Sequence, residues 1–176
     1  MGPALETLLA ELPDEAKDLR LNLAAVLGEG VLAPTQRWGV AVACALTARE
    51  PRLTAAILAD GQAHAGEGAI SDARAAAALM GMNNVFYRFK HMIGKPTYAD
   101  KPAKLRMMRL GRPASTKVDL ELYSLAASAI GGCETCVQAH ERTVLAGGLT
   151  EDHVHDAIRI ASVINGIAVA LASAPR

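Results

Sequence analysis

The chain has 176 residues, enough for one compact domain that buries roughly 70% of the surface its unfolded form would expose. Its 18 Lys and Arg residues balance its 18 Asp and Glu residues, which indicates neither a nucleic-acid-binding surface nor an acidic solvating tail. The first residues lack the pattern of a secretion signal, and no uninterrupted apolar run approaches the ~20 residues of a membrane-spanning helix. We therefore expect one cytoplasmic domain covering residues 1–176, with no nucleic-acid or membrane partner.

The composition predicts an all-α fold. Alanine dominates, aromatic residues make up only 3% of the chain, and apolar residues recur at spacings of three and four. Pro13 and Pro34 stand where first helical turns would begin, and Ser71 and Thr150, each followed by an acidic residue, are expected helix N-caps. Gly and Pro breaks then divide the chain into about eight helices, with a long loop only at 94–102. The breaks are expected at 28–33, 50–51, 65–70, 94–102, 111–114, 131–132 and 147–148, and the best-supported helices at 71–91, 115–130, 133–146 and 150–171.

A weak internal repeat runs through this pattern. The triplet Gln-Ala-His at 62–64 recurs at 138–140, each time followed by a Gly-containing break and a long Ala-rich helix. Two similar helical halves are one interpretation, and the other is that Ala-rich helices resemble one another by composition. Only the second half carries a pair of cysteines, so the first half would be a scaffold that positions the second.

The most informative pattern is Cys133 and Cys136, followed by His140. On a helix these three positions share one face, because residues three and four apart are neighbours. Gly131 and Gly132 would end the preceding helix and leave Cys133 at the start of the next, where free N–H groups and the helix dipole stabilise a thiolate. Cys136 is the better placed to lose its proton to His140, and Cys133, nearer the surface end, to meet an external disulfide. The pattern indicates a redox centre that exchanges two electrons through a small disulfide ring.

Two other interpretations of the cysteine pair stay open. A structural zinc site uses the same side chains but takes four ligands, and the further candidates, Cys44 and His64, are distant in sequence. Two cysteines in an Ala-rich core can also be packing residues, which is how we interpret Cys44, whose sequence neighbours are apolar. The remaining histidines, His91, His153 and His155, are expected to be surface or packing residues.

Glu121 lies on the apolar side of the helix predicted before the cysteines. At 100° per residue it points about 40° from Leu125 and about 60° from Val118. A carboxylate in that position is suited to pass protons to the neighbouring centre. The alternative is that a Glu at the edge of an apolar stripe reaches solvent along its own stem.

Two further segments have open interpretations. The first is a basic stretch, which forms either a solvated face or a docking site for an acidic partner or cofactor carrier. The second is a cluster of Met, Asn and aromatic residues at 80–89, which forms either a core helix with a polar pair at a helix crossing or the wall of a substrate pocket. The basic residues are Lys101, Lys104, Arg106, Arg109 and Arg112.

These motifs resemble the alkyl hydroperoxide reductase D (AhpD) family of the carboxymuconolactone decarboxylase-like superfamily. The likeness covers nearly the whole chain and is carried by segments 16–23, 80–88, 120–124, 129–136 and 139–141. It implies an all-helical domain with a duplicated helical motif, assembled as a homotrimer. It further implies an antioxidant, thiol-dependent peroxidase that also reduces a partner peroxiredoxin, alkyl hydroperoxide reductase C. No tightly bound cofactor is implied: electrons would come from dihydrolipoamide on the acyltransferase of a 2-oxoacid dehydrogenase, kept reduced by dihydrolipoamide dehydrogenase.

By position, the resemblance implies that Cys136 is the nucleophile that becomes a sulfenic acid. Cys133 would donate a proton, resolve the disulfide with Cys136 and form the mixed disulfide with the peroxiredoxin, while Glu121 and His140 would form a proton relay. Thr135 departs from the better-known family pattern, which has His between the cysteines, so no proton-transfer role carries over to that position. The rival functions are a decarboxylase-like lyase that uses a His base and no thiols, and a zinc-stabilised helical interaction module.

Overall fold

The computed structural model describes residues 1–173, and within that range the chain forms helices and connecting segments without a strand. The all-α prediction is confirmed. Three of the four best-supported helices begin and end within two residues of their predicted bounds, and the fourth is the later part of a longer helix. The elements are α1 (Pro3–Leu9), η1 (Asp14–Ala16), α2 (Lys17–Gly28), α3 (Pro34–Ala48), α4 (Pro51–Ile93), α5 (Pro96–Ala99), η2 (Met108–Gly111), α6 (Lys117–Ile130), α7 (Glu134–Ala146) and α8 (Glu151–Ser173).

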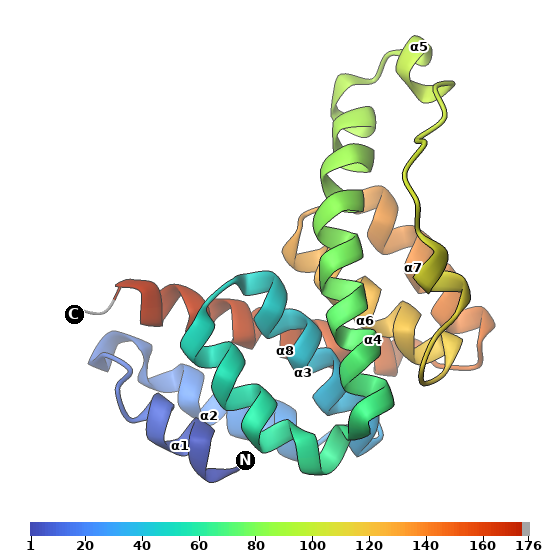
Figure 1. Cartoon of the computed structure of the whole chain (residues 1–176). Helices are drawn as coiled ribbons and strands as arrows, with labels where there is room; N and C mark the ends of the chain where they lie inside the picture. The colour runs from blue at the N-terminus through green and yellow to red at the C-terminus, as the bar shows by residue number, and fades with distance from the viewer. Residues whose placement is uncertain (174–176) are drawn as a thin grey trace.

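α4 bends sharply at Gly66, whose φ of 75° and ψ of 162° lie outside the helical region. Glycine adopts a positive φ without steric cost, so the chain turns there and continues as a second helical limb (Figure 1). The break predicted at 65–70 is therefore confirmed. The prediction that Ser71 caps the following helix is wrong, because the helix resumes directly after Gly66 and Ser71 lies inside it. Thr150 directly precedes α8, as predicted.

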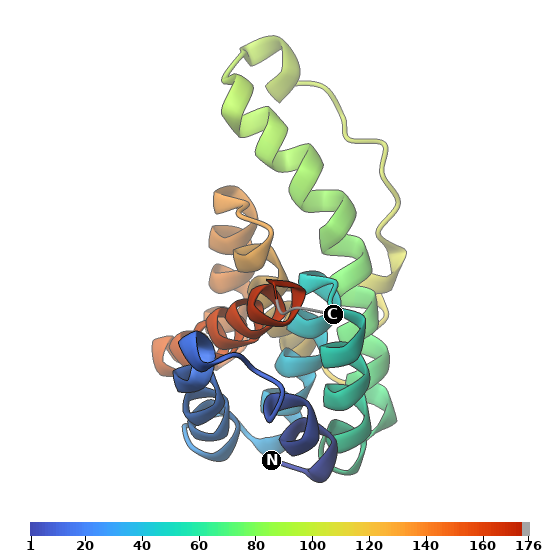
Figure 2. The same cartoon turned by 90° about the vertical axis from the view of Figure 1, so that its left-hand side faces the viewer.

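The end of the second limb projects from the body of the molecule, with α5 at its tip (Figures 1 and 2). We call residues 85–106 the arm. The long loop predicted at 94–102 is wrong in extent, because Pro96 starts the short helix α5 and irregular chain instead runs from 100 to 107. The returning segment is tied to α4 by Lys90, whose Nζ donates to the carbonyl oxygens of Ala99 at 2.8 Å and Lys101 at 3.0 Å.

The hydrophobic core is built around α3 and α6. Residues 38–45 of α3 and 120–128 of α6 are all buried. α3 packs against α4, α6 and α8, and α6 packs in addition against α7. Small side chains allow these helices to approach closely, since a Cβ atom at Gly39 would collide with the ring of Tyr123 on α6. The small residues of α3 therefore permit close packing on α6, and α6 in turn packs against α7, where the cysteine pair lies.

α8 is the one helix within residues 1–173 that is long and apolar enough to cross a membrane by length and composition alone. Core helices of globular proteins pass the same test. Its apolar face, which includes Ile160, Ile164 and Ile167, is buried, and the helix packs against α2, α3 and α6. We therefore interpret α8 as a core helix.

The order of helices repeats along the chain. α3 and the two limbs of α4 form two helices followed by a longer one, and α6, α7 and α8 do the same. The two Gln-Ala-His triplets do not occupy matching places, because His64 lies at the end of its limb, just before Gly66, whereas His140 lies in the middle of α7. The duplicated motif therefore rests on helix order and length, and not on the triplet.

Candidate active site

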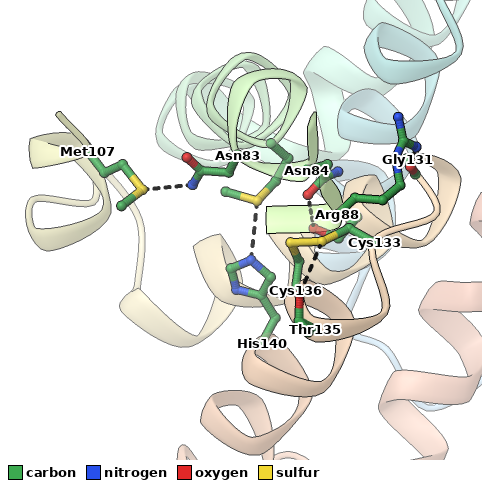
Figure 3. Close-up of a disulfide and its surroundings, with 11 residues drawn as sticks. Asn83, Asn84, Arg88, Met107, Gly131, Cys133, Thr135, Cys136 and His140 are labelled. Carbon is green, nitrogen blue, oxygen red and sulfur yellow. Dashed lines mark hydrogen bonds between the residues drawn. A yellow bond between two sulfur atoms is a disulfide. The ribbon is translucent and has the colours of Figure 1, made fainter. Parts of the chain in front are cut away.

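Cys133 and Cys136 are joined by a disulfide at the start of α7 (Figure 3). The sulfur atoms are 2.07 Å apart and the Cα atoms 5.3 Å apart. Gly132, with a φ of 65°, lets the chain turn after α6. Cys133 is then the N-cap residue of α7, and Cys136 lies in its first turn. The position predicted for the pair, directly after a Gly-Gly break at a helix start, is confirmed.

The two cysteines differ in access to solvent. Cys133 is fully buried, whereas Cys136 is 7% exposed and lines a cavity. The expectation that Cys133 lies nearer the surface is therefore wrong for the disulfide form. The second limb of α4 covers the turn that carries Cys133, and the guanidinium of Arg88 on that limb donates a hydrogen bond to the carbonyl oxygen of Gly131 (Figure 3).

Glu121 of α6 and His140 of α7 lie within hydrogen-bond distance of each other. Nδ1 of His140 lies 2.6 Å from Oε2 of Glu121, and each side chain is only 12% exposed. The alternative in which Glu121 reaches solvent is therefore wrong. A carboxylate at Nδ1 orients an imidazole and leaves Nε2 free to act on a neighbouring group. Nε2 of His140 points toward α4, where it lies 3.2 Å from Sδ of Met80 (Figure 3).

A cavity of about 320 Å³ brings Cys136 and His140 to one space. Its lining is mostly apolar, which suits an organic ligand with few polar groups. The chain contributes to it from three places: Met80, Asn83 and Tyr87 of α4, Met107 and Leu110 of the segment before α6, and Thr135, Cys136, Ala139 and His140 of α7.

The cluster at 80–89 combines both interpretations considered for it. Asn84 forms the polar pair at a helix crossing, because its Oδ1 accepts a hydrogen bond at 3.0 Å from the Ser128 hydroxyl of α6. Asn83 faces the cavity, and its amide nitrogen donates to Sδ of Met107 at 2.7 Å, while its buried Oδ1 has no partner among the described residues (Figure 3). The cluster is therefore both a helix-packing element and a pocket wall.

Asp72 holds the segment that follows η2 against α4. It is fully buried and accepts hydrogen bonds from Nη2 of Arg109 at 2.6 Å, from the N–H of Ala114 at 2.9 Å, and from the N–H and hydroxyl of Ser115 at 2.7 Å each. Burial alone would raise the pKa of Asp72, but the hydrogen bonds from Ala114 and Ser115 and the Arg109 charge outweigh it and lower that pKa. Asp72 is therefore a charged anchor inside the protein.

This anchor positions a cavity wall that sequence reasoning missed. Met107 lies two residues before Arg109 and Leu110 directly after it, so fixing Arg109 and the chain after it places both side chains at the cavity. The solvated-face interpretation of the basic stretch is therefore wrong for Arg109, while Lys104 and Arg112 are exposed as expected. Asp72, an acidic residue directly before the Ala-rich run of α4, was the available signal, but its partners are far away in sequence.

The other candidate residues lie elsewhere. Cys44 is buried in α3, and burial raises the pKa of its thiol well above the ordinary value. His64 stacks on Trp38 with ring centroids 5.1 Å apart, and exposed His91 pairs with Glu134 at 3.3 Å. Within residues 1–173, no group of three or more His, Cys, Asp or Glu side chains is arranged to hold a metal ion.

His153 and His155 lie near the start of α8. Nδ1 of His153 lies 2.8 Å from the hydroxyl of Thr150, which ties the histidine to the residue before the helix. His155 is exposed. Both positions agree with the expectation of surface or packing roles.

Comparison with known proteins identifies relatives of this chain. Residues 96–175 match the carboxymuconolactone decarboxylase family. The chain is also 58% identical over 168 residues to alkyl hydroperoxide reductase AhpD of Anaeromyxobacter dehalogenans strain 2CP-C, covering 96% of this chain and 90% of the relative. The proteins of the same name from Rhodospirillum centenum and from Bradyrhizobium sp. strain BTAi1 are 48% identical over 168 residues and 44% identical over 171 residues. These matches cover 96% and 97% of this chain and 90% and 94% of the relatives. The chain therefore belongs to the AhpD family of the carboxymuconolactone decarboxylase-like superfamily.

Proposed function

We propose that this protein is an antioxidant, thiol-dependent alkyl hydroperoxidase. The observation that carries the proposal is a disulfide whose Cys136 lines an apolar cavity together with His140, itself paired with buried Glu121. The name of its relatives, alkyl hydroperoxide reductase, supports the same reaction class. The apolar lining fits the organic part of an alkyl hydroperoxide.

In the proposed reaction, the thiolate of reduced Cys136 attacks an oxygen of the hydroperoxide. The O–O bond breaks, Cys136 becomes a sulfenic acid, and the alkoxide takes a proton and leaves as the alcohol. Cys133 supplies that proton and then attacks the sulfenic sulfur, which releases water and forms the disulfide. His140, oriented by Glu121, relays protons between these steps, since it lines the cavity together with Cys136.

Two electrons must return to the disulfide after each turnover. We assign them to dihydrolipoamide, carried on the acyltransferase of a 2-oxoacid dehydrogenase and regenerated by dihydrolipoamide dehydrogenase. The disulfide itself holds the two electrons in transit, so the scheme requires no tightly bound cofactor. The reduced pair also passes electrons to a peroxiredoxin, alkyl hydroperoxide reductase C, through a mixed disulfide with Cys133.

We further propose that the protein works in the cytoplasm as a homotrimer. The arm exposes a row of large apolar side chains, among them Met92, which is 77% exposed. Exposed apolar surfaces of this kind are typical of protein–protein contacts. Sedimentation equilibrium should then give three times the chain mass of 18.4 kDa, and Met92→Glu should lower it. A monomer at all concentrations would refute the assembly.

The enzymatic test couples dihydrolipoamide to NADH through dihydrolipoamide dehydrogenase and follows NADH consumption with cumene hydroperoxide. The wild type should turn over, and Cys133→Ser and Cys136→Ser should each abolish turnover. Cys44→Ala is the matched control and should retain activity, because Cys44 lies in the core of α3 and not at the cavity. Unchanged turnover in both active-site variants would refute the proposed function, as would decarboxylation of a lactone without the cysteines.

A further inference from the structure

The disulfide offers only one of its sulfur atoms to a ligand in the cavity. An incoming thiolate must reach the sulfur that it attacks, and the other sulfur leaves. Cys136 lines the cavity, whereas Cys133 is fully buried and follows a turn to which Arg88 of α4 is hydrogen-bonded. A reductant that enters the cavity therefore meets Cys136.

The position of Cys133 also suits it to leave. It is the N-cap residue of α7, and its side chain makes no capping hydrogen bond in the disulfide form. A thiolate at a helix N-terminus is stabilised by the unpaired N–H groups and by the helix dipole. Oγ1 of Thr135 lies 3.6 Å from Sγ of Cys133, close enough to donate a hydrogen bond to a thiolate there (Figure 3). A more stable leaving thiolate makes exchange faster.

We propose that a dithiol reductant forms its mixed disulfide with Cys136, and that Cys133 leaves as a thiolate held by the Thr135 hydroxyl. The first thiolate of the reductant bonds to Sγ of Cys136 while the Cys133–Cys136 bond breaks. The second thiol of the reductant then attacks the reductant sulfur that is bonded to Cys136. This closes a cyclic disulfide within the reductant and releases Cys136 as a thiolate. Two electrons pass to the cysteine pair, and the two protons of the dithiol convert Cys133 and Cys136 to thiols.

Electrons therefore enter the oxidised protein at Cys136, because Cys133 is buried in the disulfide form. The mixed disulfide of Cys133 with the peroxiredoxin belongs to the reduced form, after the Cys133–Cys136 bond has opened. The identity of the reductant as dihydrolipoamide rests on the proposed function, but the choice of sulfur rests on burial and on the contact with Thr135.

The first experiment locates the mixed disulfide. Oxidised wild-type protein is mixed with 8-sulfanyloctanamide, a single-thiol analogue of dihydrolipoamide that cannot close a ring, and quenched with acid after milliseconds to seconds. N-ethylmaleimide then blocks the released thiol, and tandem mass spectrometry locates both groups. The adduct should be on Cys136 and the maleimide on Cys133. The reverse placement, or equal amounts of both, would overturn the proposal.

The second experiment tests the hydroxyl group by following reduction of the disulfide with dithiothreitol. Thr135→Val should slow the reduction about tenfold, the effect of losing one hydrogen bond to a charged group. Thr135→Ser should restore the wild-type rate. Thr143→Val is the matched control on the same helix, because the Thr143 hydroxyl donates to the carbonyl oxygen of Ala139 and not to a cysteine. Equal rates for Val and Ser at position 135 would overturn the role of Thr135.

The two proposals fail in different ways. If the adduct forms on Cys136 but dihydrolipoamide supports no hydroperoxide turnover, the proposed function is wrong and the choice of sulfur stands. If turnover is normal and the adduct forms on Cys133, the choice of sulfur is wrong and the proposed function stands.

Discussion

Replacement of Asp72 by Asn should destabilise the protein and loosen one wall of the cavity. The carboxylate is fully buried and binds three neutral donors of Ala114 and Ser115 in addition to Arg109. The Asn amide has one acceptor oxygen, but its NH2 group is itself a donor and cannot accept hydrogen bonds from the remaining donors. Removing one partner of a buried ion pair costs about 3–5 kcal/mol. We expect about 3 kcal/mol, because Arg109 is 35% exposed and can turn to water.

The effect of this replacement should also depend on pH. The folded-state pKa of Asp72 lies below the ordinary aspartate value of about 3.9. Its ionised form therefore stabilises the protein fully above pH ~4, and this stabilisation is lost as the pH falls through the folded-state pKa. The difference between wild type and Asp72→Asn should be largest near neutral pH and should shrink toward pH 3.

Urea unfolding followed by circular dichroism at 222 nm measures both effects. Asp14→Asn is the matched control, because Asp14 forms an exposed ion pair with Lys17 and its loss should change the free energy of unfolding by less than about 0.5 kcal/mol. A change of less than about 1 kcal/mol for Asp72→Asn at pH 7, or a difference that stays constant into acid, would refute this reasoning. The KM for hydroperoxide should also rise, because Met107 and Leu110 lose their anchored position.

Three further predictions concern the site and its surroundings. Glu121→Gln should lower kcat in the coupled peroxidase assay about 100-fold, because a proton relay contributes about that much or more, and an unchanged kcat would exclude the relay. Gly131→Ala should lower the free energy of unfolding in urea by about 1–3 kcal/mol, because the added Cβ would collide with the Asn84 amide. Gly28→Ala, at a position with open space around it, should leave that free energy unchanged. Equal effects of the two substitutions would contradict the close approach of Gly131 to Asn84. Cys44 should resist iodoacetamide in the native protein and react only in urea, because burial disfavours its thiolate, and rapid native labelling would contradict that burial.

The sequence determined the local features of this protein. Helix periodicity, the Gly-Gly break at 131–132 and the spacing of the cysteines depend on residues near one another in the chain, so they predicted the helices and the position of the redox pair at the start of α7. The same information placed His140 on the face that carries the cysteines. Ser71 was misassigned because Gly66 turns the chain so abruptly that the next helix needs no separate cap.

Only the tertiary structure decided which distant groups meet. Packing of α6 on α7 converts Glu121 from an edge residue into the buried partner of His140, and the contact of Asp72 with Arg109 brings two unpredicted side chains to the cavity. The cysteine pair shows both levels at once. Its spacing is local and could be read from the sequence, but access to Cys136 comes through a cavity that α4 and the segment before α6 help to line, and these lie far from α7 in the chain. The exposure of a side chain depends on every element that packs around it, and a local sequence pattern carries no information on distant elements.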